Sequence, residues 1–536
     1  MNASAEPKPV PSSVDAWAAH GFTGDPALLI RETTLVNAWV KRWSEAPDQP
    51  VLCDGNGAWI TAAQLSQRSR VVAGRLAGAG LQAGDRILMS CAPSVDLVVA
   101  HVAALRLGLV VVPVNTAFSA RELANVLNES LAKLSVVDDP ARVPHGPVVG
   151  PTIDLAVALA VELADAQPPL LDNAGSDDPA MLVFTSGTTG RPKGVMLTHA
   201  NLLSSAEALR IAWRWAPTDR LVLSLPLFHM HGLGVGVHVT LLTGASAVII
   251  PRFSVDDVLD AVGRHHATLL FGVPTMWVRI LASPRVGELA QLRLCVSGSA
   301  PLAADVWQGL ADRGGQQILE RYGMTETVMN VSNPYDGERR PGSVGLALPG
   351  VSVRLHEVSD DGVGEIVLTG PNVFAGYWER PERNRRASGG RASNEAKRRG
   401  AAPVLRSESN ADAFTADGWF RTGDLGSFDP DGYLRIVGRS KDLIITGGFN
   451  VYPRDVEDVL REHAGVADVA VAGELSSEWG ETVVAYVVRA DSAVDADILM
   501  GHCASRLAGY QRPRRIVFLP ELPRNALGKV VKSLLP

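Results

Sequence analysis

Short runs rich in Val, Ile and Leu alternate along the chain with stretches whose apolar residues recur at helical spacing. The short runs are bounded by turn-forming residues and predict buried strands. Segments such as 120–130 and 254–266 predict amphipathic helices between them. This alternation indicates an α/β protein with mainly parallel sheets. The predicted strands lie at 86–92, 110–115, 180–186, 220–227, 245–251 and 292–299.

The pattern changes near residue 365, where short strands separated by Gly and Asp turns predict a compact β-rich region up to residue 439. Helices and strands alternate again beyond Asp442 and predict a small α+β domain. A chain of 536 residues should form more than one domain, since single cores stop growing near roughly 250–300 residues. We expect an N-terminal extension over 1–36, a large domain over 37–438 and a C-terminal domain over 439–536.

One segment inside the large domain, 384–410, contains six arginines, one lysine and almost nothing to bury. Such a composition does not offset the entropy lost on ordering. We therefore predict a disordered, basic surface insert. The alternative is a charged loop that binds an acidic partner.

The composition is that of an ordinary soluble globular protein, with 46% hydrophobic and 20% charged residues. A net charge of −7 argues against nucleic acid as the main partner. The four cysteines are scattered and suggest neither a zinc site nor a disulfide framework, which fits the reducing cytoplasm.

The most apolar run covers 95–115, but Asp96, His101 and Arg106 interrupt it. A membrane span needs about 20 residues with few or no charges. We predict a buried helix that leads into a strand, and no integral membrane segment.

Residues 185–194 form a loop with three glycines, several hydroxyl side chains and a single lysine. It lacks the common GxxxxGK[ST] phosphate-loop pattern. It follows a predicted strand and precedes a helix-like segment, which is the arrangement of many phosphate sites. A flexible linker is the alternative. The predicted phosphate contacts are Thr185, Ser186, Gly187, Thr188, Thr189, Gly190 and Lys193.

Five more motifs follow in order: SGSAP at 297–301, RYGMTET at 321–327, GWFRTGD at 418–424, GRSKDLIITGGFNVYP at 438–453 and PRNALGKVVK at 523–532. Together with the loop, they resemble the signature motifs of the acyl-adenylate-forming (ANL) superfamily, over roughly residues 37–532. The resemblance implies a large adenylating domain, made of two αβ layered subdomains and a β-rich subdomain, and a mobile C-terminal domain.

The resemblance implies an ATP-dependent carboxylic acid:CoA ligase that forms an acyl-adenylate and pyrophosphate, then an acyl-CoA and AMP. Cations and positioning carry most of such a phosphoryl transfer. The loop would hold the β- and γ-phosphates of ATP, Thr325 would contact the α-phosphate, and Glu326 would hold Mg²⁺. The implied nucleotide contacts are Ser299, Ala300, Pro301, Arg321, Tyr322, Gly323, Asp424 and Arg439, with Tyr322 stacking on adenine and Asp424 accepting the ribose hydroxyls.

Two further roles fall to the C-terminal domain. Lys529 would insert between the attacking carboxylate and the α-phosphate. After adenylation the domain would rotate about Lys441, where many relatives have Asp. The backbone at Gly447, Gly448 and Phe449 would then line the path of the CoA thiol.

The amino-acid sequence around LPLFHMHGL and FGVPTMWVRIL resembles that of the malonyl-CoA synthetase branch more than that of a fatty-acyl branch. A short dicarboxylate needs a cation for its second carboxylate, because an unpaired buried charge is very costly. The candidate acid-binding residues are His229, Arg252, Arg293 and Met329. The alternatives are a medium- or long-chain fatty-acyl-CoA synthetase, an acyl-AMP ligase that loads a carrier protein, and a non-catalytic relative, against which the intact motifs argue.

Overall fold

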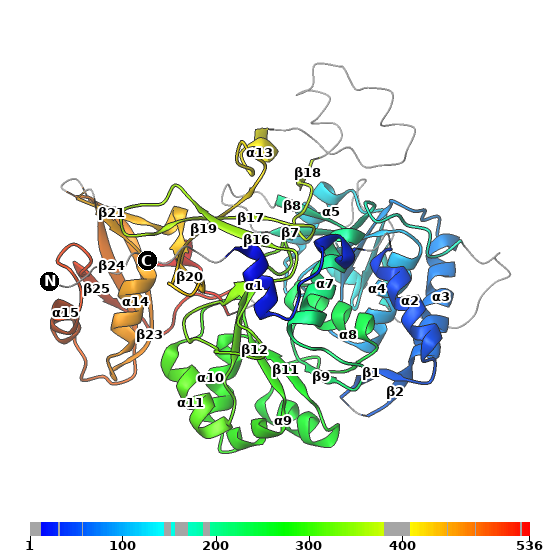
Figure 1. The fold of residues 1–536 in the computed structure, drawn as a ribbon, viewed down its shortest axis with the longest axis horizontal. Coiled ribbons are helices and arrows are strands. Elements are labelled where there is room, and N and C mark those ends of the chain that lie inside the picture. Colours follow the sequence, from blue (N-terminus) through cyan, green and yellow to red (C-terminus); the bar gives the residue numbers. More distant parts are fainter. Residues whose placement is uncertain are drawn as a thin grey trace.

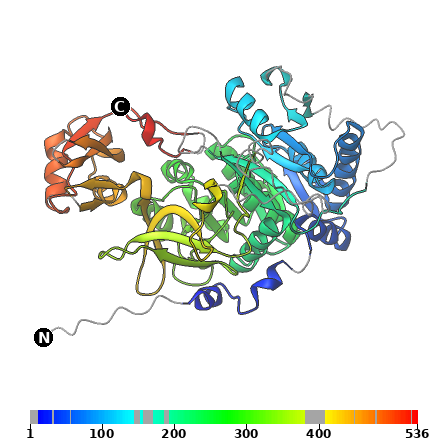
Figure 2. The same cartoon turned by 90° about the horizontal axis from the view of Figure 1, so that it is seen from above.

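The two predicted domains are present in a computed structural model, and the small C-terminal one lies beside the large one (Figures 1 and 2). The structure describes residues 12–30, 33–55, 57–143, 152–155, 170–185, 193–379, 408–447, 449–476, 479–525 and 528–536. The mixed α/β class with one large and one small domain is confirmed.

A nine-stranded sheet forms one half of the large domain, in the order β15-β14-β13-β12-β11-β9-β10-β1-β2. Its strands from β13 to β1 run parallel, so their carboxyl ends share one edge, where the loops that carry the site emerge. The bounds are β1 Pro50–Asp54, β2 Trp59–Thr61, β9 Arg220–Leu223, β10 Ser246–Ile249, β11 Leu269–Gly272, β12 Leu294–Ser297, β13 Leu319–Tyr322, β14 Val331–Ser332 and β15 Leu346–Ala347.

The other half is a seven-stranded sheet, in the order β18-β8-β7-β4-β3-β5-β6. It corrects one prediction: strand β8 (Lys193–Thr198) pairs antiparallel with β7 (Pro179–Thr185), so the phosphate loop connects two strands of a hairpin and leads into a strand, not a helix. The helix α7 (His199–Ala212) begins only after β8. The remaining strands are β3 Arg86–Ser90, β4 Val110–Pro113, β5 Leu134–Val137, β6 Thr152–Asp154 and β18 Tyr377–Trp378.

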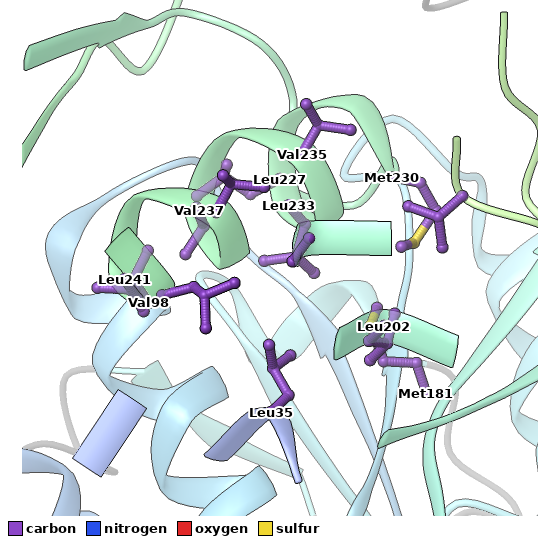
Figure 3. Packing of buried hydrophobic residues seen from close by; sticks show 14 of the residues in the cluster. Leu35, Val98, Met181, Leu202, Leu227, Met230, Leu233, Val235, Val237 and Leu241 are labelled. Carbon is purple, nitrogen blue, oxygen red and sulfur yellow. The ribbon is translucent and has the colours of Figure 1, made fainter. Parts of the chain in front are cut away.

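Helices from both halves bury one continuous apolar core (Figure 3). Helix α4 (Val95–Arg106) leads into β4, as the sequence predicts, and α5 (Ala120–Ser130) matches its predicted range. Within the described residues, no helix has both the length and the apolar character needed to cross a bilayer. The other helices are α2 Leu35–Glu45, α3 Ala62–Gly78, α8 His238–Thr243, α9 Val255–Arg264, α10 Pro274–Ala282 and α11 Ala304–Gly314.

A four-stranded antiparallel sheet, β16-β17-β19-β20, forms the β-rich part, with bounds Ser352–His356, Gly364–Thr369, Phe420–Phe428 and Leu434–Arg439. Most of the predicted insert, 384–407, lies outside the described residues. Its last residues belong to α13 (Glu408–Ala411), and the Asn410 side chain hydrogen-bonds both backbone groups of Tyr377. The insert therefore ends in helical structure that is fixed to the large domain.

The predicted N-terminal extension packs on this β-rich part. Helix α1 (Ser13–Ala19) buries Ala16 against Leu346 and Tyr433, and the Trp17 indole donates to the carbonyl of Val351 at 2.8 Å. A 3-10 turn, Pro26–Leu29, follows.

The C-terminal domain is α+β, with a five-stranded sheet and two helices, α14 (Pro453–Arg461) and α15 (Ala496–Ala504). Its main apolar cluster is separate from that of the large domain. The strands are β21 Ile444–Thr446, β22 Phe449–Val451, β23 Val466–Ser476, β24 Gly480–Arg489 and β25 Arg515–Phe518.

Three buried histidines lie in the core of the large domain. The Nε2 atoms of His101 and His238 are 2.9 Å apart, and neither ring nitrogen of His199 has a partner among the described residues. Burial lowers the pKa of His101 to about 3 and that of His199 to about 4. These side chains are therefore neutral in the folded protein.

We predict that this cluster makes the protein acid-labile. Below pH 6.5 these histidines bind protons in the unfolded chain but stay neutral in the folded protein. The unfolding free energy should therefore fall as the pH drops from 6.5 toward 4. His199→Leu should flatten this fall while leaving the thermal midpoint at pH 8 nearly unchanged. Thermal unfolding between pH 8 and pH 5 tests this. His356→Leu, at a partly exposed histidine of β16, is the control, and equal flattening by both variants would contradict the prediction.

Candidate active site

Three predicted nucleotide residues meet where β13, β19 and β20 come together. The Tyr322 hydroxyl donates to Asp424 Oδ2 at 2.6 Å, and Arg439 Nε lies 3.0 Å from Asp424 Oδ1. The charge of Asp424 raises the pKa of Arg439, and burial raises that of the Tyr322 hydroxyl. These contacts hold the Asp424 carboxylate in one orientation, which suits a group that accepts two hydroxyls.

A tight turn after β13 presents the predicted Mg²⁺ carboxylate. A Cβ at Gly323 would lie 2.2 Å from the carbonyl oxygen of Val328, so only glycine fits there, and Val328 has a φ of 57°. The turn exposes Thr325 partly and buries Glu326.

The Glu326 carboxylate connects this turn to the phosphate loop. Its Oε1 accepts from the Tyr377 hydroxyl at 3.0 Å, and Lys193 Nζ lies 4.9 Å from the centre of the Tyr377 ring. Burial raises the pKa of Glu326, so a cation beside it would favour the ionised form. A buried carboxylate is also a suitable hard oxygen ligand for Mg²⁺. Thr185 and Lys193 face each other across the β7–β8 hairpin, whereas Ser186, Gly187, Thr188, Thr189 and Gly190 lie outside the described residues.

The predicted acid residue His229 precedes an irregular helical segment, His231–Val237, with π-type hydrogen bonding. One of its glycines is sterically required, because a Cβ at Gly232 would lie 2.3 Å from the carbonyl oxygen of Pro226. π-type turns are frequent at functional sites. The backbone N–H of His231 donates to His229 Nδ1 at 3.2 Å, and His231 Nδ1 lies 3.4 Å from Ser299 Oγ.

Ser299 belongs to the SGSAP loop that follows β12. It has a φ of 71°, which is rare for a residue other than glycine. Ala300 and Pro301 continue the loop toward the surface. The residue before it, Gly298, packs directly on Arg321, since a Cβ there would lie 2.3 Å from Arg321 Cζ.

Arg321 is a buried cation with no counter-charge among the described residues. Its Nε and Nη2 atoms have no hydrogen-bond partner among the described residues, and burial lowers its pKa to about 9. The charge of Arg321 further lowers the pKa values of His229 and His231, which burial has already depressed. The cluster of Arg321, His229, His231 and Ser299 is therefore positive, and no carboxylate of the described part of the chain is paired with it.

Lys529 lies close to the nucleotide residues although it belongs to the other domain. A Cβ at the preceding Gly528 would lie 3.0 Å from the hydroxyl of Thr275, on α10 of the large domain. The Lys529 side chain still contacts solvent, but partial dehydration lowers its pKa. Arg439 lowers it further, and Asp424 opposes the shift.

The same orientation of the domain keeps the predicted thiol-path residues away from the site. Phe449 is 55% exposed and stacks on Tyr510 of its own domain, with ring centroids 4.7 Å apart. Gly447 has a φ of 56°, and Gly448 is outside the described residues. Lys441, the predicted hinge, lies in a 3-10 turn (Ser440–Asp442) between the two domains.

The two predicted acid-pocket arginines are not brought to this cluster. Arg293 precedes β12 and so lies at the opposite end of that strand from Ser299. Its guanidinium forms a bidentate ion pair with the buried Asp219, with Nη2 and Oδ2 2.5 Å apart. It also donates a hydrogen bond to the carbonyl of Trp213. The structure therefore contradicts the predicted role of Arg293, because strand alternation gave its face but not its end of the sheet. Arg252 follows β10 and is exposed, while Met329 is buried behind Gly323.

The sequence did not reveal three of these features. Arg321 was grouped with the nucleotide residues, although its guanidinium faces the histidines. His231 and Tyr377 are not among the predicted site residues. The pairing of β18 with β8, which brings Tyr377 beside Lys193, joins residues far apart in the chain.

Comparisons with known proteins identify the family of the chain. The family model "AMP-binding enzyme" matches residues 39–378, and "AMP-binding enzyme C-terminal domain" matches 455–529. The chain therefore belongs to the AMP-binding enzyme family. It is an AMP-forming acyl-CoA synthetase that uses ATP, Mg²⁺ and CoA.

Several relatives align along most of their length. Feruloyl-CoA synthase of an Amycolatopsis species is 35% identical over 93% of this chain and 98% of its own. Sulfoacetate–CoA ligase of Cupriavidus necator is 34% identical over 94% of this chain and 97% of its own length. Malonate–CoA ligase of Arabidopsis thaliana is 32% identical over 85% of this chain and 78% of its own length. ATP-bound MatB from Rhodopseudomonas palustris has a similar structure, with a TM-score of 0.82, 38% identity, and coverage of 93% and 98%.

Proposed function

We propose that the protein activates a short carboxylic acid that carries a second anionic group, with malonate or a methylmalonate-like diacid as first choice. The observation that carries this proposal is the buried Arg321 guanidinium, two of whose nitrogens lack partners among the described residues. A buried cation without a counter-charge is costly, and an anionic ligand group offsets that cost.

The reacting carboxylate and the second anionic group would lie on opposite sides of the SGSAP loop. Arg321 would receive the distal group by two hydrogen bonds, since a guanidinium matches a carboxylate in a forked geometry. Ser299 and the neutral His229 and His231 would complete its surroundings. An apolar chain end placed there would leave the arginine without a partner, which argues against a long-chain fatty acid.

The names of the relatives are compatible with an acid substrate that carries a second anionic group. Malonate and sulfoacetate both carry a second anionic group, whereas ferulate does not. The relatives act on several different acids at similar sequence identity. The choice of a diacid substrate is therefore supported by Arg321 and not by the degree of sequence identity.

The chemistry would proceed in two steps. A carboxylate oxygen of the acid attacks the α-phosphorus of ATP, and the bond to pyrophosphate breaks. Glu326 would hold Mg²⁺, which neutralises charge on the phosphoryl oxygens, while Lys193 binds the departing pyrophosphate and Asp424 fixes the ribose. The CoA thiol then attacks the acyl carbon, and AMP leaves.

A panel of acids with the purified protein, ATP, Mg²⁺ and CoA tests this proposal. We expect AMP release and a CoA thioester with malonate or methylmalonate, and at least tenfold lower kcat/KM with butyrate, octanoate and ferulate. A preference for butyrate or octanoate over malonate would overturn the choice of substrate. Acid-dependent adenylation without a CoA thioester would indicate another acceptor, such as a carrier protein.

A further inference from the structure

The first α-helix of the C-terminal domain, α14, contacts the large domain through a buried arginine. Arg454, its second residue, donates from Nη1 to the carbonyl of Ile436 at 2.5 Å and from Nη2 to the carbonyl of Gly342 at 3.5 Å. Both acceptors belong to the large domain. These contacts cross the predicted hinge at Lys441, because α14 follows it and the acceptors precede it.

Behind Gly342 lies a second buried group, the carboxylate of Glu320 on β13. Its Oε1 accepts from the N–H of Gly342 at 3.1 Å, and its Oε2 accepts from the N–H of Leu302 at 3.1 Å. Gly342 is therefore bonded to Glu320 through its N–H and to Arg454 through its C=O. Burial raises the pKa of Glu320 to about 7, and the positive charge of Arg454 opposes part of that rise.

The hydrogen bonds that offset the cost of burying Arg454 exist only in this orientation of the domains. Its closest carboxylate is Asp458, one turn along the same helix, with Nε–Oδ2 at 3.7 Å, and its Nε makes no hydrogen bond among the described residues. If the C-terminal domain turned away, Arg454 would lose both carbonyls and the attraction of Glu320. An exposed surface arginine would carry no such dependence on domain position.

The position of β13 makes this contact relevant to the reaction. The strand that carries Glu320 also carries Arg321 and Tyr322, and the turn with Thr325 and Glu326 follows it. The same orientation of the C-terminal domain brings Gly528 against Thr275 and Lys529 near Asp424. One rigid element of the large domain thus supports both the nucleotide residues and the contact with α14.

We propose that Arg454, held by Gly342, Ile436 and the buried Glu320, is a positioning residue that latches the C-terminal domain in the orientation that delivers Lys529 to the nucleotide. Arg454 touches no reacting atom in this role. It sets the fraction of molecules in which the lysine is in place, and so it controls the adenylation step. The identity of the acid does not enter this proposal.

A matched pair of variants on α14 tests the latch. Arg454→Met removes the cross-domain hydrogen bonds, and Arg461→Met is the control, because the polar contacts of Arg461 among the described residues are with Glu457, Asp458 and Val469 of its own domain. Acid-dependent pyrophosphate exchange should fall about tenfold or more in Arg454→Met, since hydrogen bonds from a charged group are among the stronger ones. It should stay within about twofold in Arg461→Met.

A distance measurement separates a latch from a folding defect and needs no substrate acid. Spin labels at Ala304→Cys on α11 and Ala504→Cys at the end of α15 report the orientation of the domains, and all four native cysteines are buried. The expected result is one dominant distance in the parent protein and in Arg461→Met, and a broadened or shifted distribution in Arg454→Met. Unchanged distances in Arg454→Met, or equal losses of exchange in both variants, would overturn the proposal. Failure of malonate in the acid panel would leave the distance result intact.

Discussion

Lys529→Ala should lower adenylation by about 10²- to 10³-fold, the usual effect of removing one donor aimed at developing charge. Adenylation brings a carboxylate against the α-phosphate, so negative charge accumulates where Lys529 is delivered. The lysine lies among Arg439, Asp424 and Asp442, and Gly528 fixes its approach against Thr275. Partial dehydration lowers its pKa and strengthens its interaction with an anion.

Acid-dependent pyrophosphate exchange measures this step without the thioester reaction. Lys532→Ala is the matched control, because Lys532 binds Glu457 at 3.1 Å and the carbonyl of Val471 at 2.6 Å within the C-terminal domain. That variant should lose thermal stability but retain most exchange. Near-normal exchange by Lys529→Ala would remove Lys529 from the adenylation step.

The second large effect concerns the choice of acid. Arg321→Met should lower kcat/KM for malonate by about 10²-fold or more, because breaking one partner of a buried charge pair typically costs about 2–5 kcal/mol. The loss for butyrate should be less than about threefold, since butyrate has no distal charge to pair. Methionine keeps an unbranched, flexible side chain, although a shorter one, and removes the charge and the donors.

Stability gives an independent check on Arg321. A buried cation without a counter-charge destabilises the free protein, so Arg321→Met should not lower the thermal midpoint in the absence of ligands. Arg293→Met is the comparison, because it leaves the buried Asp219 without its ion pair and should destabilise the protein without changing the preference between the acids. Equal losses for malonate and butyrate in Arg321→Met would exclude Arg321 from recognition of the acid.

Much of the fold could be predicted from the chain because local patterns carry it. The predicted helix over 120–130 coincides with α5, and the apolar run over 95–115 becomes α4 and β4. The phosphate loop is different: the sequence predicts a loop over 185–194 that leads into a helix-like segment, yet residues 193–198 form strand β8. Pairing with β7 decides this, and such pairing depends on contacts that a local pattern does not contain.

The amino-acid sequence by itself determined the class of the protein, because several motifs in a fixed order specify one chemistry. It also predicted which residues carry that chemistry, from the phosphate loop to Lys529. Only the tertiary structure separates the three arginines considered for the acid, since the sequence alone does not distinguish Arg252, Arg293 and Arg321. Arg293 is paired with Asp219, Arg252 is exposed, and Arg321 is buried with no counter-charge among the described residues, which is why we propose it for the acid. The electrostatic cost of a charge depends on its surroundings, and folding creates those surroundings.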